Sequence, residues 1–159
     1  GAAAQQCRPV RSARPVSTTA DLPDLNVWLA LVWPEHSHHQ HAVHYWEVQA
    51  SDQVLFSTVT ALGLVRLVSQ PKLMGPAVRN PAEASALLDA LCQQPGVGLA
   101  EPEHDGWEVF HQLLRGGEIP ARLYTDAHLA ALAIANGWRL VSFDRDFERF
   151  AGLQRLPLP

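Results

Sequence analysis

Four aspartates stand where a strand is expected to end or a helix to begin. Asp24 and Asp144 each come directly after an apolar stretch, and Asp146 follows two residues later. Asp126 opens an expected helix. Carboxylates at close range raise each other's pKa, so a fold that gathers several usually offsets their charge with a divalent cation. Oxygen ligands favour Mg²⁺ or Mn²⁺, and the sequence therefore indicates metal-assisted phosphoryl chemistry if these segments meet.

The elements that must position these aspartates alternate between short apolar strands and amphipathic helices. Strands are expected at about 22–24, 54–57, 97–99 and 138–143, and helices at about 27–32, 37–50, 58–69, 81–91, 107–114 and 126–135. Thr58 or Thr60 is expected to cap the third helix, and Thr125 the last. This alternation predicts a parallel sheet covered on both faces, with ligands at the carboxyl ends of its strands. Asp24, Asp126 and Asp144 should therefore face one crevice.

Size and composition fit one folded domain. The chain has 159 residues, of which 47% are hydrophobic and 18% charged. Residues 1–20 contain three arginines and no acid, and are interpreted as a disordered leader or an expression remnant. The whole chain has a net charge of −4, so residues 21–159 alone have a net charge of −7. This argues against a general nucleic-acid-coating protein. The longest apolar runs are too short to span a bilayer. Cys7 and Cys92 are interpreted as incidental thiols in a reducing, cytoplasmic compartment.

Five segments carry a family resemblance. They are Pro23-Asp24-Leu25-Asn26-Val27, then His36, His39 and Trp46, then Gly63-Leu64-Val65-Arg66-Leu67, then residues 125–133, and then residues 142–153. In this order and spacing they resemble the PIN-domain ribonucleases, and most closely the VapC-type toxins of bacterial type II toxin–antitoxin pairs. The resemblance covers residues 21–159, which are then the nuclease domain, and implies a three-layer α/β/α sandwich with a central parallel sheet.

The resemblance also implies an activity. It is that of an endoribonuclease toxin dependent on Mg²⁺ or Mn²⁺, which hydrolyses RNA phosphodiester bonds with metal-activated water. By position, Asp24, Asp126 and Asp144 correspond to the metal-binding and catalytic residues, and Asp146 to a further catalytic-site residue. The expected partners are RNA, a cognate antitoxin protein and a second copy of the chain, with no membrane.

Other positions of the resemblance carry finer expectations. Asn26 and Thr60 are expected to line the site, and Arg66 to contact an RNA phosphate, an antitoxin or an internal acid. The broader family pattern has a glutamate at the position of Gly63. This departure casts doubt on a two-metal site and favours one tightly held ion, with a second recruited by RNA.

Alternative interpretations remain open. One is a PIN nuclease of RNA processing without an antitoxin, and another is a catalytically silent module that binds RNA or a partner. The histidines between 36 and 44 could indicate zinc, but no cysteine lies nearby, so a structural or solvent-facing role is favoured. Trp46, Trp107 and Trp138 fall on apolar faces and are interpreted as core or partner-contact residues rather than base-stacking platforms.

Overall fold

The computed structural model describes residues 9–10, 20–100 and 104–159. In this part of the chain, six parallel strands form one sheet in the order β1-β4-β3-β2-β5-β6. The strands are β1 (Pro9–Val10), β2 (Ala20–Pro23), β3 (Gln53–Phe56), β4 (Val97–Ala100), β5 (Arg139–Ser142) and β6 (Gln154–Pro157). Pro9 and Val10 therefore belong to the sheet, although they fall in the segment expected to be a leader. The rest of 1–19 lies outside the described residues.

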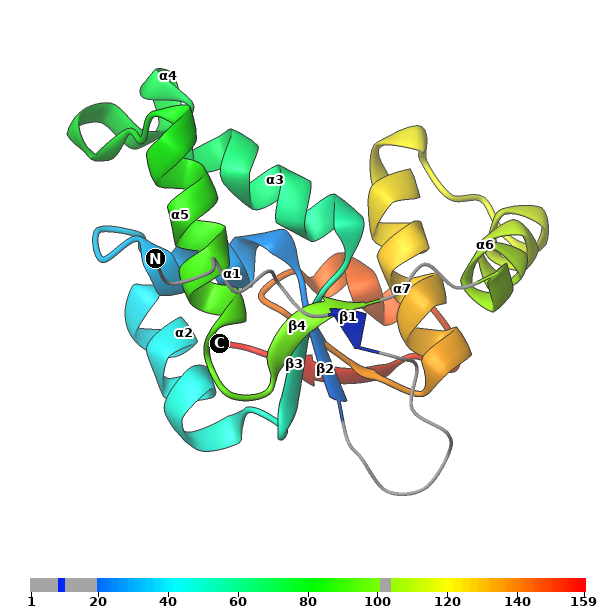
Figure 1. The fold of residues 1–159 in the computed structure, drawn as a ribbon. Coiled ribbons are helices and arrows are strands. Elements are labelled where there is room, and N and C mark those ends of the chain that lie inside the picture. The colour runs from blue at the N-terminus through cyan, green and yellow to red at the C-terminus, as the bar shows by residue number, and fades with distance from the viewer. Residues whose placement is uncertain (1–8, 11–19, 101–103) are drawn as a thin grey trace.

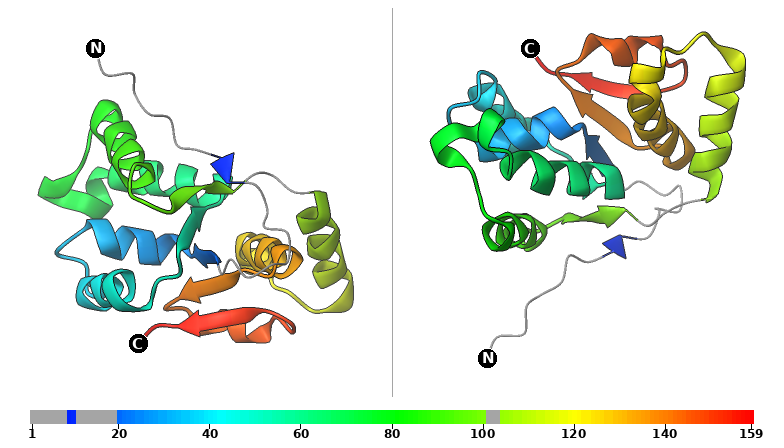
Figure 2. Two further views of the ribbon diagram at one scale, coloured as in Figure 1. Left: turned by 60° about the horizontal axis from the view of Figure 1, so that its bottom comes forward. Right: turned by 90° about the horizontal axis from the view of Figure 1, so that it is seen from above.

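Helices cover both faces of the sheet (Figures 1 and 2). They are α1 (Leu25–Val32), α2 (His39–His44), α3 (Thr58–Val68), α4 (Pro71–Met74), α5 (Pro81–Cys92), α6 (His104–Gly116) and α7 (Tyr124–Asn136). A π-helical turn extends α2 over Tyr45–Gln49, and 3₁₀ turns span Gly75–Ala77, Ala121–Leu123 and Arg145–Arg149. Helices α1, α2, α3 and α5 lie on one face, and α7 with α6 on the other. The predicted three-layer α/β/α sandwich is confirmed.

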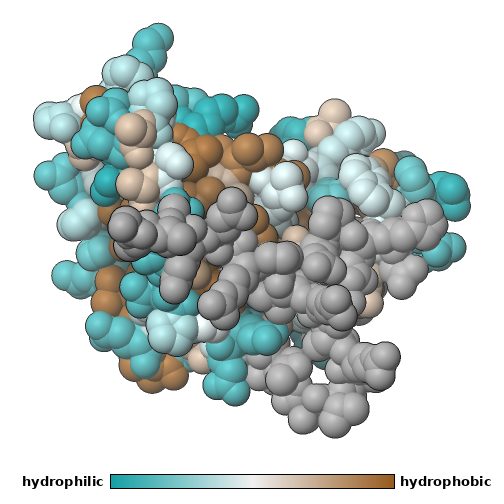
Figure 3. Space-filling view, viewed as in Figure 1, coloured by the Kyte–Doolittle hydropathy of each residue, from teal (hydrophilic) through white to brown (hydrophobic). Residues whose placement is uncertain are grey.

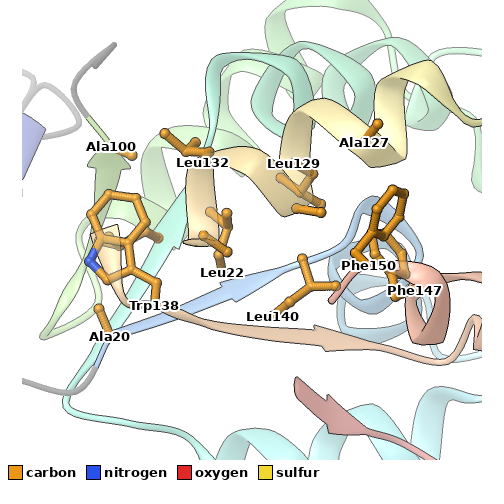
Figure 4. Packing of buried hydrophobic residues seen from close by; sticks show 13 residues of the cluster. Ala20, Leu22, Ala100, Ala127, Leu129, Leu132, Trp138, Leu140, Phe147 and Phe150 are labelled. Carbon is orange, nitrogen blue, oxygen red and sulfur yellow. The ribbon is translucent and has the colours of Figure 1, made fainter. Parts of the chain in front are cut away.

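Alternating strand residues supply a core to each face, as the two-residue repeat of a strand requires. Leu22 of β2 and Leu140 of β5 are buried beneath Leu129 of α7, as Figure 4 shows. On the opposite face, Phe56 of β3 stacks on Trp28 of α1 with ring centroids 3.8 Å apart. Both faces of the sheet are therefore apolar and covered, which is typical of parallel sheets.

The helix caps differ from the sequence-based expectation. The N-cap of α3 is Ser57, whose extended backbone lets its Oγ accept a hydrogen bond from Thr60 N at 3.0 Å. Thr60 Oγ1 in turn accepts a hydrogen bond from Ser57 N, so the two residues form a capping box. Thr125 is likewise inside α7, whose N-cap position is Leu123. Both cap predictions were therefore wrong, because α3 and α7 begin earlier in the chain than these residues would require.

Two further findings concern the remaining expectations. Cys92 is disulfide-bonded, so the expectation of an incidental free thiol at this position is wrong, while Cys7 lies outside the described residues. No helix in the described ranges is both long enough and apolar enough to cross a bilayer.

Candidate active site

The strand order creates a crevice beside β2. From β2 the chain runs to β3 through α1 and α2 on one face, whereas it reaches β5 through α6 and α7 on the other face. Strand β2 lies between β3 and β5, so the direction of winding reverses beside it, and ligands bind at such reversal points at the carboxyl ends of the strands. Asp24 directly follows β2, Asp144 follows β5, and Asp126 lies in the first turn of α7.

These three aspartates line one cavity of about 210 Å³. Its lining consists of Asp24, Leu25, Asn26, Val59, Thr60, Thr125, Asp126, Leu129 and Asp144. The expected convergence of segments about a hundred positions apart is therefore observed. Within the described part of the chain, no lysine, arginine or histidine lines this cavity, so its three carboxylates have no basic neighbour inside it.

Asp24 is held in place by its neighbours. Its Oδ1 accepts a hydrogen bond from Leu25 N at 2.7 Å, which caps α1, and its Oδ2 accepts one from Ser142 Oγ at 3.1 Å. Burial raises the pKa of the Asp24 carboxyl, the charge of Asp144 adds to this rise, and the two hydrogen bonds oppose it. The carboxylate is therefore fixed in direction but costly to ionise.

The Asp126 carboxyl also has a raised pKa. Burial and then the charges of Asp24, Asp144 and Asp146 raise the pKa of Asp126 to about 6, while Arg122 lowers it. A carboxyl with this pKa is mostly ionised at neutral pH, although its acidic neighbours oppose the ionisation. A cation in the cavity would offset this repulsion.

Ser142 connects the two strand-end aspartates. Its buried hydroxyl donates to Asp24 and accepts a hydrogen bond from Asp144 N at 2.9 Å. Asp144 Oδ1 in turn accepts a hydrogen bond from Asp146 N at 2.8 Å and caps the following 3₁₀ turn. Sequence reasoning did not single out Ser142, although a serine that ends an apolar strand two residues before an aspartate is a usable signal.

Asp146 lies next to the cavity but does not line it. Its Oδ2 forms an ion pair with Arg122 Nη1 at 3.3 Å, and the side chain of Arg122 is 67% exposed. The charge of Asp146 nevertheless contributes to the raised pKa of Asp126. Its position fits a contribution through the local charge rather than direct contact with an ion.

The two positions expected to line the site differ in location from the expected substrate-contact residue, Arg66. Asn26 and Thr60 line the cavity. The Thr60 hydroxyl already accepts from Ser57 N at 2.9 Å and donates to Ser57 O at 3.2 Å, so its main role is to hold the start of α3. Arg66 does not line the cavity, and it lies six residues, or about 9 Å along the helix, beyond Thr60.

Gly63 has a direct physical explanation. A Cβ atom added to Gly63 would lie 2.7 Å from Leu25 Cδ2. Leu25 itself lines the acidic cavity. An apolar side chain therefore occupies the space next to Gly63, where the broader family pattern has a glutamate.

The donor set fits a hard cation. The described residues contain no group of three or more His, Cys, Asp or Glu side chains arranged to hold a metal. Mg²⁺, however, keeps several waters and is often bound through only one or two carboxylates. The oxygen-rich cavity and the mutual repulsion of Asp24 and Asp126 are compatible with such an ion.

Two histidines of the segment 36–44, His38 and His39, make structural contacts. His39 Nδ1 lies 2.7 Å from Ala30 O, and the ring of His38 stacks on Phe143 with centroids 4.4 Å apart. These contacts attach α2 to α1 and to the end of β5. They match the structural interpretation of this segment rather than a zinc site.

A second charged cluster, missed by sequence reasoning, lies at the opposite end of β2. Asp21 is fully buried and accepts hydrogen bonds from Tyr45, Ser51 and Arg139, including a two-point contact with the guanidinium at 2.9 Å. Burial alone would raise the pKa of Asp21, but the bonds from Arg139, Tyr45 and Ser51 outweigh it, and the net pKa is lowered. Asp21 is thus a satisfied structural acid.

Comparison with known proteins identifies the family. The PIN-domain family model matches residues 22–153. The chain belongs to the PIN-domain family. Relatives of this PIN domain include ribonuclease VapC41 of Mycobacterium tuberculosis, 32% identical over 140 residues that cover 84% of this chain and 94% of the relative. Ribonuclease VapC39 of the same organism is 36% identical over 129 residues, which cover 77% of this chain and 87% of the relative. These relatives place the PIN domain among the VapC-type proteins.

Solved structures agree on the fold. VapBC-1 from nontypeable Haemophilus influenzae matches this PIN domain with a TM-score of 0.64 at 15% identity, covering 87% of this chain and 98% of that one. VapC20 of Mycobacterium tuberculosis, described as a sarcin-ricin loop cleaving toxin, gives a TM-score of 0.60 at 18% identity. The match covers 84% of this chain and 98% of VapC20. At these identities the structures support the architecture alone.

Proposed function

We propose that this PIN domain is an endoribonuclease toxin that hydrolyses RNA with Mg²⁺ or Mn²⁺. The observation that carries the proposal is that Asp24, Asp126 and Asp144 line one cavity in which no described basic side chain balances their charge. The relatives named ribonuclease VapC support RNA as the substrate. No covalent enzyme nucleophile is required.

In the proposed site, Asp24 and Asp126 hold the cation and Asp144 completes the acidic rim. When bound, the ion supplies an activated water and stabilises the charge that grows on the phosphate oxygens. Asp24 is kept in position by Leu25 N and Ser142 Oγ, so its binding direction is set before the ion arrives. The counter-charge of a bound ion would offset the repulsion from Asp24 and Asp144, which adds to the effect of burial on the pKa of Asp126.

A cognate antitoxin completes the proposal. Several similar folds come from VapBC assemblies, including VapBC2 from Rickettsia felis bound to a promoter DNA fragment. An antitoxin that presents a basic side chain would satisfy the acidic cavity without a metal and would thereby inhibit cleavage. We place the toxin in the cytoplasm, as a homodimer.

The test is cleavage of total RNA by the wild type and by Asp24→Asn and Asp126→Asn. Both variants remove one charge with little change of shape, and we expect both to lose Mg²⁺-dependent cleavage. Asp52→Asn is the matched control because Asp52 is exposed and lies just before β3, at the other end of the sheet. Equal cutting by all four proteins, or wild-type cutting that survives a chelator, would refute the proposal.

Calorimetric titration with Mn²⁺ separates an active nuclease from a silent binding module. We expect saturable binding to the wild type and to Asp52→Asn, and strongly weakened binding to Asp126→Asn. A wild type that takes up no Mn²⁺ would favour the silent module instead.

A further inference from the structure

A second, larger pocket adjoins the acidic cavity. It measures about 420 Å³, within the roughly 300–1,000 Å³ of pockets that enclose small organic ligands. It is lined by Ser57, Thr58, Val59, Ala100, Gly106, Trp107, Phe110, Tyr124, Thr125, His128 and Leu132. Val59 and Thr125 line both this pocket and the acidic cavity. Whatever occupies the pocket therefore lies next to whatever the aspartates bind.

The walls of this aromatic pocket are flat rings with accessible surface. Trp107 is 48% exposed and Tyr124 is 45% exposed. The ring centroid of Trp107 lies 5.4 Å from that of Phe110 and 4.7 Å from that of His128. These contacts hold the Trp107 ring in place, although about half of its surface is open to solvent. Trp107 is therefore not a core residue, and its expected role as a partner-contact residue is untested. Trp138 is fully buried, as expected.

The chemistry of the lining limits the occupant. Among the described residues, neither a lysine, an arginine nor a carboxylate lines the pocket, so a phosphate or another fully charged group would lose hydration without gaining a full counter-charge. A neutral, planar group is suited to the aromatic walls, and the hydroxyls of Thr58, Tyr124 and Thr125 offer hydrogen bonds at its edge. Figure 3 shows apolar surface over α3, and exposed Val59 and Leu62 belong to this helix.

We propose that the aromatic pocket binds one unpaired nucleobase of the RNA, on the nucleotide that flanks the phosphodiester held at the acidic cavity. The inference rests on the proposed ribonuclease function. Residues 21–159 carry a net charge of −7, which weakens their attraction to the RNA backbone, so contacts that do not need charge add to affinity, and stacking of a base on an aromatic ring is such a contact. A base inside a duplex cannot present its faces, so the substrate is a single-stranded or looped segment.

The test combines a protein change with an RNA change. A hairpin oligonucleotide is built around a loop site cut by the wild type, and a matched oligonucleotide lacks the base next to the cut. We expect Trp107→Ala to lower kcat/KM on the intact hairpin by about 5- to 150-fold, as expected for one stacked base. The abasic hairpin should lower the wild-type value similarly, and the two changes together should cost little more than either alone.

Control variants protect the conclusion from folding effects. Trp107→Phe keeps a stacking ring and should restore most of the activity, whereas Tyr124→Ala should reproduce the loss. Val48→Ala, at a residue 68% exposed on another part of the molecule, should change nothing. Thermal melting of each variant checks that the fold is retained.

The outcomes separate this inference from the proposed function. If the wild type cuts no RNA with Mg²⁺ or Mn²⁺, the proposed function fails. If it cuts, and the effects of Trp107→Ala and of the missing base are independent, the base-binding inference is overturned while the nuclease stands. If Trp107→Ala cuts normally but escapes inhibition by the antitoxin, the pocket binds a peptide side chain, and the inference is again overturned.

Discussion

The buried cluster around Asp21 gives the sharpest stability prediction. Asp21→Asn keeps the shape of the side chain but removes its charge and one acceptor oxygen. Arg139 then loses its buried counter-ion, and the hydrogen bonds from Tyr45 Oη at 2.6 Å and Ser51 Oγ at 2.7 Å can no longer all be accepted. We therefore expect a large loss of folding free energy without any direct effect on the candidate active site.

The size of the loss follows from burial. Removing one partner of a buried ion pair costs about 3–5 kcal/mol. Asp21 is fully buried, but the side chain of Arg139 is 31% exposed and water can replace part of its lost contact. The lower end of the range, about 3 kcal/mol, is therefore expected. In a chain of this size, that corresponds to a fall in Tm of roughly 6–12 °C.

Urea and thermal unfolding at pH 7 would measure this effect in the wild type and in Asp21→Asn, with Asp52→Asn as the exposed control. A double-mutant cycle with Arg139→Gln isolates the pair, and we expect the two losses to be strongly non-additive. RNA cleavage by Asp21→Asn well below its Tm should stay near the wild-type rate. A loss below about 1 kcal/mol, or one equal to that of the control, would show that the cluster contributes little to stability.

Three further predictions concern the site. Because the pKa of Asp126 is raised from 3.8 to about 6, the contribution of Asp126 to the stability of metal-free protein should fall as pH rises through this range, and in a chelator the Tm advantage of Asp126→Asn should grow from pH 4 to pH 7.5; a pH-independent difference would contradict this. Ser142→Ala should cost about 1–3 kcal/mol in urea unfolding and lower the cleavage rate, because Asp24 and Asp144 lose their shared hydroxyl; unchanged unfolding and cleavage would exclude that role. Gly63→Ala should destabilise by no more than about 1 kcal/mol in thermal unfolding, because the end of the Leu25 side chain must shift while alanine favours the helix, and it should be stabilising in a Leu25→Ala background; additive effects would argue against the contact.

The convergence of the aspartates was predictable because it follows from topology. Residues that end parallel strands or begin the helices between them meet at one edge of the sheet, and Asp24, Asp126 and Asp144 all occupy such places. The helix caps were less accessible to sequence reasoning. Several hydroxyl residues compete at the start of α3, and the backbone conformation at Ser57 decides among them.

Contacts between distant residues could not be predicted from local patterns. Asp21 pairs with Arg139, 118 positions away, and nothing in the sequence around either residue identifies the other. The aromatic pocket was missed for a related reason. Trp107 follows the apolar periodicity of its helix, but the packing of α6 against α7 leaves about half of its surface exposed.

The short strand β2 has an aspartate near each end. The register of β2 against β5 therefore affects the position of the aspartate that lines the acidic cavity. Asp21 lies opposite Arg139 in the pairing with β5, and Asp24 follows three residues later, roughly 10 Å along the strand. A slip of one residue would turn every β2 side chain to the other face and would swing Asp24 out of the cavity. The ion pair between Asp21 and Arg139 thus favours the native register of β2, and in this register Asp24 reaches the acidic cavity.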